Sequence, residues 1–294
     1  MAEPGFTGAS LDRADHLRLD AERMADMMAN GDARLLDLAE LDPVLEPEGT
    51  LHWTSFAEAH VDETIFLGIR DGVPLFAPLV RTRALGRRSW NVMRLIDRMS
   101  PRDAAIWGAA RSLNEWHNKH RFCGVCGTAT ETFRAGWGRQ CPSCGAEHFP
   151  RVDPVVIMLA EHDGRVLVAR QHQYPPGRYS ALAGFVEPGE SIEEAVAREL
   201  MEEAGLAVRD VAYVASQPWP FPGSLMIACL AKADTDAIVL ESNELEDGFW
   251  VDRAGVRAAL AGAPDAPFQA PPPFAIANTL LTRWVEGREE GERG

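Results

Sequence analysis

The stretch Gly184–Leu206, GFVEPGESIEEAVARELMEEAGL, restricts the possible folds of this chain more than any other segment. Ser191 is followed three residues later by Glu194, which is the pattern of a capping box at a helix N-terminus. Gly205 falls where a left-handed residue commonly ends a helix. These two signals predict a helix over residues 192–204.

The apolar face of this predicted helix becomes acidic in its last two turns. At about 100° per residue, Ala195 and Val196 lie on one arc. Glu199, Glu202 and Glu203 fall on the same arc, whereas a solvated charged face would lie opposite the apolar residues. Like charges at these spacings cost about 0.2 to 0.5 kcal/mol each, so a cation is expected to offset them. Oxygen ligands on one face suit Mg²⁺ or Mn²⁺, which implies metal-assisted phosphoryl or nucleotidyl transfer to water.

The same stretch resembles the Nudix box, G-x5-E-x7-R-E-U-x-E-E-x-G-U with U apolar, at every fixed position. Nudix hydrolases cleave nucleoside diphosphate linkages, and the resemblance implies that reaction here. It also implies that Glu199, Glu202 and Glu203 bind two or three Mg²⁺ or Mn²⁺ ions per active site. The catalytic base is then one of these glutamates or a neighbour of a metal-bound water.

The remaining fixed positions of the box have structural roles in the resemblance. Glu190 and Arg198 are expected to brace the loop against the helix. Gly184 and Gly189 are expected to allow the turns of the loop, and Gly205 ends the helix.

Four cysteines form two CxxC pairs that are 14 residues apart: Cys123, Cys126, Cys141 and Cys144. Two such pairs supply four thiolates at the spacing of a structural Zn²⁺ site. Redox pairs or disulfides are the alternatives, and a reducing cytosol disfavours them. A closed four-cysteine site has no open position, so one Zn²⁺ is expected to staple a small domain and not to perform chemistry.

A second informative stretch is SQPWPFPGSLM, residues 216–226. Trp219 and Phe221 offer flat faces for a purine or nicotinamide ring, while the prolines stiffen the loop. Gln217 and Ser224 are expected to supply hydrogen bonds to a substrate. A proline-rich connector with packed aromatic side chains is the alternative.

This loop, after a Nudix box and a four-cysteine ribbon, is similar to the S-Q-P-W-P-F-P-x-S signature of the NADH pyrophosphatase branch of the Nudix hydrolases. Gly223 stands at the variable position, where the branch commonly has glutamine. The resemblance implies hydrolysis of NADH or NAD⁺ to NMN(H) and AMP. Members of the branch are homodimers, and bacterial ones also remove NAD caps from RNA 5′ ends.

Four further positions carry expectations from the same resemblance. Phe149 and Phe185 are expected to be aromatic partners of a bound base, with Phe149 replacing a tyrosine that is often found there. Glu244 corresponds to an additional acidic metal ligand, although two acidic residues that follow it closely are alternatives. Ala277 matches a position whose backbone carbonyl reaches a metal or its water.

The length of 294 residues suits two or three domains. We expect an N-terminal, divergent Nudix-like α/β domain over residues 1–100 and a linker helix within 101–120. A zinc ribbon over 121–149 and a catalytic Nudix domain over 150–290 follow.

Strands and helices alternate in the last of these regions, which predicts an α/β/α sandwich with a mixed sheet. Asp163-Gly164 marks a turn between two of its strands, and a terminal helix is expected over 274–285. In the N-terminal half, Asp71-Gly72 marks a hairpin turn, and apolar spacing predicts a helix over 101–117.

Composition restricts the partners. The net charge of −15 opposes non-specific binding to long polyphosphates. No apolar run is long enough to span a membrane, and the first residues lack the pattern of a signal peptide, so a cytoplasmic location is expected.

Two other functions remain open at this stage. One is a Nudix pyrophosphatase for another dinucleotide, such as ADP-ribose or a diadenosine polyphosphate. The other is a zinc-ribbon regulator that binds nucleic acid and keeps a vestigial Nudix fold. The presence of all the box glutamates argues against the latter.

Overall fold

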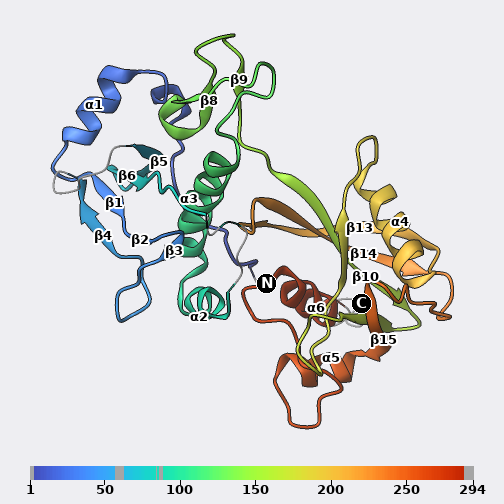
Figure 1. The fold of residues 1–294 in the computed structure, drawn as a ribbon. Coiled ribbons are helices and arrows are strands. Elements are labelled where there is room, and N and C mark those ends of the chain that lie inside the picture. The colour runs from blue at the N-terminus through green and yellow to red at the C-terminus, as the bar shows by residue number, and fades with distance from the viewer. Residues whose placement is uncertain (1–2, 57–62, 84, 86–88, 288–294) are drawn as a thin grey trace. The chain divides into compact units, whose positions relative to one another are not determined.

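A computed structural model describes residues 3–56, 63–83, 85 and 89–287 (Figure 1). Its contacts divide the chain into two compact units. The sandwich unit comprises residues 1–5, 153–217 and 224–294, and the ribbon unit comprises residues 6–152 and 218–223. Neither unit is continuous in sequence.

The sandwich unit is built on a six-stranded sheet with the order β13-β14-β10-β11-β15, in which β12 also pairs with β10. Strands β10 and β14 are parallel, whereas β10 is antiparallel to β11 and β12, and β11 is antiparallel to β15. The sheet is therefore mixed, as the sequence predicts. The strands are β10 (Asp153–His162), β11 (Arg165–Gln171), β12 (Leu182–Phe185), β13 (Val208–Trp219), β14 (Ser224–Ala233) and β15 (Leu245–Asp252).

Three helices pack against this sheet: α4 (Ile192–Ala204), α5 (Arg253–Leu260) and α6 (Ile276–Glu286). The apolar side chains of α4 form one core cluster with the sheet, and those of α5 and α6 form another. Successive side chains of β10 alternate between the two clusters, as a strand covered on both faces requires. The predicted α/β/α sandwich is confirmed.

Local signals place the ends of α4 where the sequence predicts them. The side chain of Ser191 accepts from the Glu194 amide at 3.2 Å, and the Glu194 carboxylate accepts from the Ser191 amide at 2.7 Å. Gly205 ends the helix with φ 68°. The terminal helix predicted over 274–285 is observed as α6, two residues later at its start.

The ribbon unit contains a four-stranded sheet of order β4-β1-β6-β5, in which β1 and β6 are parallel. Its strands are β1 (Arg34–Leu36), β4 (Trp53–Ser55), β5 (Thr64–Arg70) and β6 (Val73–Pro78), with a separate pair β2 (Leu38–Ala39) and β3 (Asp42–Pro43). Its helices are α1 (Ala21–Ala29), α2 (Trp90–Arg98) and α3 (Pro101–Lys119), with 3₁₀ turns at Asp15–Leu17 and Arg134–Gly136. The α/β character predicted for this region is confirmed.

Both predicted hairpin turns are observed. Asp71 and Gly72 have φ values of 52° and 80° between β5 and β6. Asp163 and Gly164 have φ values of 46° and 74° between β10 and β11. The helix predicted over 101–117 is α3, which continues to Lys119.

The cysteine-bearing segment forms a small antiparallel sheet of its own within the ribbon unit. The sheet has the order β7-β8-β9, with β7 (Glu131–Phe133), β8 (Gly138–Gln140) and β9 (Glu147–His148). This is the region that the sequence predicts as a zinc ribbon.

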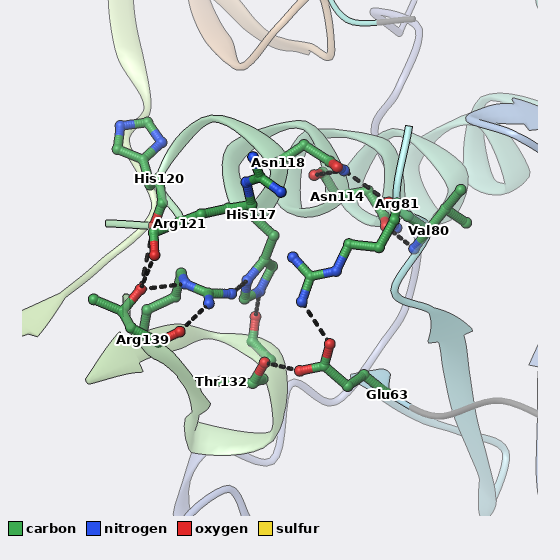
Figure 2. A network of polar contacts seen from close by, with 12 residues as sticks. Glu63, Val80, Arg81, Asn114, His117, Asn118, His120, Arg121, Thr132 and Arg139 are labelled. Carbon is green, nitrogen blue, oxygen red and sulfur yellow. Dashed lines mark hydrogen bonds and ion pairs between the residues drawn. The ribbon is translucent and has the colours of Figure 1, made fainter. Parts of the chain in front are cut away.

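Helix α3 carries a buried polar face toward this small sheet (Figure 2). His117 donates from Nε2 to the Gly136 carbonyl at 2.8 Å and accepts at Nδ1 from Arg139 at 3.0 Å. Arg139 also donates to the Thr130 hydroxyl at 2.7 Å. Burial, together with the charge of Arg139, lowers the pKa of His117 to about 4. The imidazole is therefore neutral at pH 7, with its tautomer set by its two partners.

Two asparagines of α3 hold an adjacent extended segment by its backbone (Figure 2). Asn114 accepts from the Val80 amide at 2.7 Å and donates to the Pro78 carbonyl at 3.0 Å. Asn118, one turn later, accepts from the Thr82 amide at 3.1 Å and donates to the Val80 carbonyl at 2.7 Å. The two amides together replace the neighbouring strand that this segment would otherwise need.

We expect the buried His117 to make the protein less stable in mild acid. Its folded pKa of about 4 lies below the ordinary 6.5, so the unfolded chain binds more protons between these values. The contribution of His117 to stability is therefore complete above about pH 6.5 and falls by about 3 kcal/mol toward pH 4. Urea unfolding at a series of pH values should show that His117→Gln removes this part of the loss. His16→Gln, at an exposed position, is the matched control; an unchanged slope in His117→Gln would contradict the assignment.

Candidate active site and metal centre

The acidic end of α4 is partly buried against the sheet. Glu199 and Glu203 are 8% and 4% exposed, whereas the side chain of Glu202 is 60% exposed. Two of the three glutamates on the predicted arc are therefore buried. The third, Glu202, is exposed because it lies at the edge of the arc. Glu202 instead accepts from Arg198 at 2.9 Å.

Strand β12 and helix α4 approach each other closely at Gly184. A Cβ on Gly184 would lie 1.8 Å from Cδ of Glu199, which is closer than any real contact. The absence of a side chain at position 184 thus makes room for a buried carboxylate. Gly184 positions Glu199 by leaving this space.

Arg198 joins the loop after β12 to the helix. It donates to both carboxylate oxygens of Glu190, at 2.6 and 2.9 Å, and to the Phe185 carbonyl at 2.9 Å. Glu190 also accepts from the Glu187 amide at 2.9 Å. The Arg198 guanidinium is the main cause that lowers the pKa of Glu190 to about 2. Gly189, with φ 102°, permits the turn just before Glu190.

The pKa values of both buried glutamates are raised. Burial is the largest cause that raises the pKa of Glu203 to about 8, followed by the charge of Glu199 and a hydrogen bond with Glu244. Burial also raises the pKa of Glu199. Such a group of desolvated, mutually repelling carboxyls is typical of a site for a cation, which would stabilise the charged forms.

Glu244 belongs to this acidic cluster, and its two acidic neighbours have other partners. Glu244 lies in the turn before β15, and its side chain forms a hydrogen bond with the side chain of Glu203. Glu246 pairs with Arg170, and Asp247 accepts from the Tyr179 hydroxyl. Among the three candidates, the geometry favours Glu244 as the additional ligand.

The donor set of this cluster fits a divalent cation with oxygen ligands. Glu199, Glu203 and Glu244 supply carboxylate oxygens only, which Mg²⁺ and Mn²⁺ prefer. Arg198 also donates to Glu199 at 2.9 Å and so supplies positive charge at the same place. Within the described part of the chain, the four cysteines are the only group of three or more His, Cys, Asp or Glu residues whose ligand atoms all lie within 4.8 Å of one another.

Those cysteines fit a zinc ion. The Sγ atoms of Cys123 and Cys144 are 3.7 Å apart, and those of Cys126 and Cys141 are 3.4 Å apart. All four are free thiols, so the disulfide alternative is not realised. Backbone amides that face Cys123 are the main cause that lowers its pKa to about 6, which favours the thiolate that binds metal.

Residues 218–223 of the aromatic loop belong to the ribbon unit, although Gln217 before them and Ser224 after them belong to the sandwich unit. Trp219 and Phe221 are partly buried, and their ring centroids lie 5.2 Å apart in an edge-on contact. Both residues thus keep part of their surface exposed. Ser224, which starts β14, is 9% exposed.

Gln217 is fully buried, and its side chain bonds to the backbone. It donates to the carbonyls of Gly5 and Phe274 at 2.8 and 2.7 Å, and it accepts from the Ile276 amide at 2.9 Å. Gly5 fits tightly there, since a Cβ would lie 2.4 Å from the Phe274 carbonyl oxygen. Both amide hydrogens of Gln217 are therefore used in bonds to the backbone. The side chain links the segments around Gly5 and Phe274 and has no free donor for a substrate, unlike the role expected from the sequence.

The other residues expected from the resemblance lie in different surroundings. Phe149 and Phe185 are 50% and 61% exposed, so their rings are accessible. Ala277 is buried in the cluster of α5 and α6, on the face of the sheet opposite the apolar side of α4. The role of the Ala277 carbonyl therefore rests on the resemblance alone.

Two functional candidates were missed in the sequence. His148 lies 3.3 Å from the Cys123 sulfur, and its position four residues after Cys144 is a signal that was overlooked. Arg111 contacts the aromatic loop from helix α3. Nothing in the sequence around Arg111 distinguishes it from a surface arginine.

Replacement of Gly184 by alanine should disturb Glu199. The new methyl group would overlap the carboxylate, so we expect about 1 to 3 kcal/mol of destabilisation from overpacking. We also expect weaker Mn²⁺ binding, which electron paramagnetic resonance can measure. Gly31→Ala is the control, because its Cβ would meet no atom within 4 Å. Equal Mn²⁺ affinity in both variants would show that Gly184 does not position Glu199 for a cation.

Without added Mg²⁺ or Mn²⁺, the contribution of Glu203 to the stability of the protein should decline as the pH rises from about 4.5 to about 8. The folded pKa of Glu203, about 8, lies above its ordinary value, so the folded state holds the proton more tightly. The stabilising contribution is complete below pH 4.5 and is lost through the folded pKa. Thermal unfolding of Glu203→Gln should lack this decline. A decline of the same size in Glu203→Gln would assign it to another group.

Two family models match the chain. One is described as a NUDIX domain and matches residues 150–270, and the other is described as an NADH pyrophosphatase zinc ribbon domain and matches residues 118–149. The first covers β10 to β15 with α4, and the second covers the three-stranded cysteine sheet.

Several curated proteins that are similar in sequence to this chain are described as NAD-capped RNA hydrolases. The NAD-capped RNA hydrolase NudC of Mycobacterium bovis is 37% identical over 304 residues, which cover 96% of this chain and 95% of that protein. The NAD-capped RNA hydrolase NUDT12 of Homo sapiens is 45% identical over 197 residues, which cover 64% of this chain and 43% of that protein. The chain thus aligns with less than half of the human relative. Among the described residues, no helix combines the length and apolar character needed to cross a membrane.

Proposed function

The chain belongs to the Nudix hydrolases that carry an NADH pyrophosphatase zinc ribbon, and we propose that it hydrolyses the diphosphate linkage of NAD(H) to NMN(H) and AMP. The observation that carries this proposal is the pair of buried glutamates at the end of α4, Glu199 and Glu203, with the exposed Glu244 hydrogen-bonded to Glu203. Carboxyl groups are crowded and desolvated in this way where a protein binds cations for catalysis.

The proposal includes Mg²⁺ or Mn²⁺, two or three ions per active site, held by Glu199, Glu202, Glu203 and Glu244. When bound, these ions would polarise the diphosphate and lower the pKa of a coordinated water. The fit rests on the donor set, which consists of carboxylate oxygens, and on the raised pKa of Glu203.

The residues of the chain contribute positioning and charge. Arg198 ties Glu190 to the helix and holds the Phe185 carbonyl, so the loop and the acidic end of α4 keep one arrangement. Glu203, once ionised, and Glu199 place negative charge where cations and water are to be oriented. One of these glutamates, or a neighbour of the attacking water, accepts the proton.

The aromatic residues are proposed to bind the base. Phe149 and Phe185 are exposed, and Trp219 and Phe221 are partly exposed. Stacking of a purine or nicotinamide on such surfaces would select dinucleotides by their bases. The committed hydrogen bonds of Gln217 argue against a direct contact between its side chain and the substrate.

An NAD cap on an RNA 5′ end contains the same diphosphate linkage, and the names of the relatives support it as a second substrate. We further propose that the protein is a cytoplasmic homodimer, which rests on the resemblance to the NADH pyrophosphatase branch. Light scattering of the purified protein tests the dimer. The net charge of −15 makes any RNA contact dependent on local arginines.

The test is a chromatographic time course with Mg²⁺ or Mn²⁺ and equal concentrations of NADH, NAD⁺, ADP-ribose, diadenosine tetraphosphate and an NAD-capped RNA. NMN(H) and AMP should form fastest from NAD(H) or the capped RNA. Glu203→Gln should reduce turnover on the order of 100-fold or more, because the buried charge that holds cations is lost.

Glu193→Gln is the matched control, since Glu193 is an exposed glutamate of the same helix and should keep full activity. Near wild-type turnover by Glu203→Gln would remove Glu203 from the active site. Faster cleavage of ADP-ribose or the diadenosine compound would keep the hydrolase and refute NAD(H) as its substrate.

A further inference from the structure

The aromatic loop, residues 218–223, is anchored in the ribbon unit by a cluster of four rings. Phe6 contacts Trp219 edge-on at 5.7 Å and Trp107 at 6.3 Å between ring centroids. Phe221 contacts Trp107 at 6.1 Å. Phe6 and Trp107 are fully buried, so the loop packs on a fixed apolar base.

Arg111 of α3 binds the loop through both its backbone and a ring. Its Nε donates to the Pro220 carbonyl at 3.1 Å, and its guanidinium lies 4.8 Å from the centroid of the Phe221 ring. The cation and the hydrogen bond act on adjacent residues of the loop, so together they restrict its backbone and the direction of Phe221.

The other contacts of Arg111 fix the guanidinium itself. Its Nη1 donates to the Leu41 carbonyl at 3.3 Å and lies 3.4 Å from the Asp42 carboxylate. Its Nη2 lies 3.9 Å from the buried Glu115 carboxylate. Arg111 is 1% exposed, and its guanidinium nitrogens contact three separate segments of the ribbon unit. The geometry therefore requires an arginine, because a lysine ammonium cannot reach these segments with a planar fork.

Gly108, one turn before Arg111, allows the loop to approach the helix. A Cβ at position 108 would lie 3.1 Å from the Phe6 ring and 3.4 Å from Cγ of Pro220. The contact with the Phe6 ring is tight, so Phe6, on which Trp219 packs, would have to shift by a few tenths of an ångström, whereas the contact with Pro220 is close to an ordinary one. Helix α3 thus holds the loop in two ways: Arg111 binds it, and Gly108 leaves space beside it.

We propose that Arg111 is a positioning residue, which holds residues 218–223 so that Trp219 and Phe221 present their accessible surfaces to the base of a dinucleotide. This inference rests on the proposed function and adds to it a residue outside the Nudix box and outside the loop. It predicts that the base selectivity of the enzyme depends on helix α3, far from the metal-binding glutamates in sequence.

Arg111→Lys tests the proposal while it retains a positive charge beside Glu115. We expect KM for NADH to rise about tenfold, because the hydrogen bond to Pro220 is lost, and kcat to stay within about twofold. Asn114→Ala is the matched control, since Asn114 is a buried residue of α3 that binds residues 78–80 and not the loop. An equal rise of KM in Asn114→Ala would overturn the proposal and leave Arg111 a general structural residue.

A double-mutant cycle with Trp219→Ala shows whether Arg111 acts through the loop. If it does, Arg111→Lys should raise KM much less in the Trp219→Ala background than in the unaltered protein. Full additivity of the two effects would overturn the proposal.

Gly108→Ala provides a second test if Arg111→Lys does not fold. Alanine favours the helix, so stability should be maintained, while the tight contact of its methyl group displaces the Phe6 ring on which Trp219 packs. We expect a several-fold higher KM for NADH with an unchanged melting temperature. An unchanged KM in a folded Gly108→Ala variant would contradict the proposed positioning.

Hydrogen exchange of residues 216–224, measured without substrate, separates this inference from the proposed function. Arg111→Lys should accelerate exchange in this segment and leave α4 unchanged. Inactivity of the unaltered protein on every dinucleotide would refute the proposed function, and the exchange rates would still decide whether Arg111 fixes the loop. Unchanged exchange in the variant would overturn the inference in either case.

Discussion

The guanidinium of Arg198 is the contact on which the acidic site depends. It reaches Glu190, Glu199 and Glu202 together with the Phe185 carbonyl, so one cation joins the end of β12, the following loop and helix α4. Without it, the box would be a loop of negative charges beside a helix of negative charges. Arg198 neutralises the outer part of this group and leaves Glu203 in a buried environment that raises its pKa. The site thus contains three acids that Arg198 binds directly and, in Glu203, one whose negative charge burial disfavours.

Helix α3 has a corresponding role in the ribbon unit, with polar groups in place of a purely apolar face. Asn114 holds an extended segment, His117 and Arg139 hold the cysteine sheet, and Arg111 holds the aromatic loop (Figure 2 shows the first two). Buried polar side chains of this kind are directional, because each loses its partner if the helix rotates or shifts. They fix the register of α3 more closely than apolar packing would. Its central position in the unit explains why so many of its polar residues are buried.

Local chemistry allowed much of this structure to be predicted. The ends of α4 follow from Ser191, Glu194 and Gly205, and the two hairpins follow from Asp-Gly pairs, since each signal acts within a few residues. Contacts between distant residues were not predictable in this way. Gln217 looked like a substrate ligand because its partners, Gly5 and Phe274, are remote in sequence. Likewise, the periodicity of α4 placed Glu202 on the acidic arc of the helix. It did not predict that the side chain is 60% exposed, because exposure depends on contacts with segments that are distant in sequence.

Because each of the two units is made of segments that are separated in sequence, neither can fold completely until most of the chain has been synthesised. The base beneath the aromatic loop, Phe6 and Trp107, is synthesised more than a hundred residues before Trp219 and Phe221. Gly5 is likewise synthesised long before Gln217 and Phe274, with which it forms its contacts. Since domains that are continuous in sequence can fold in order as they emerge, a chain with two discontinuous units must hold apolar surface uncovered during elongation. Newly made protein would therefore depend on chaperones at a stage when most of its residues have already been joined.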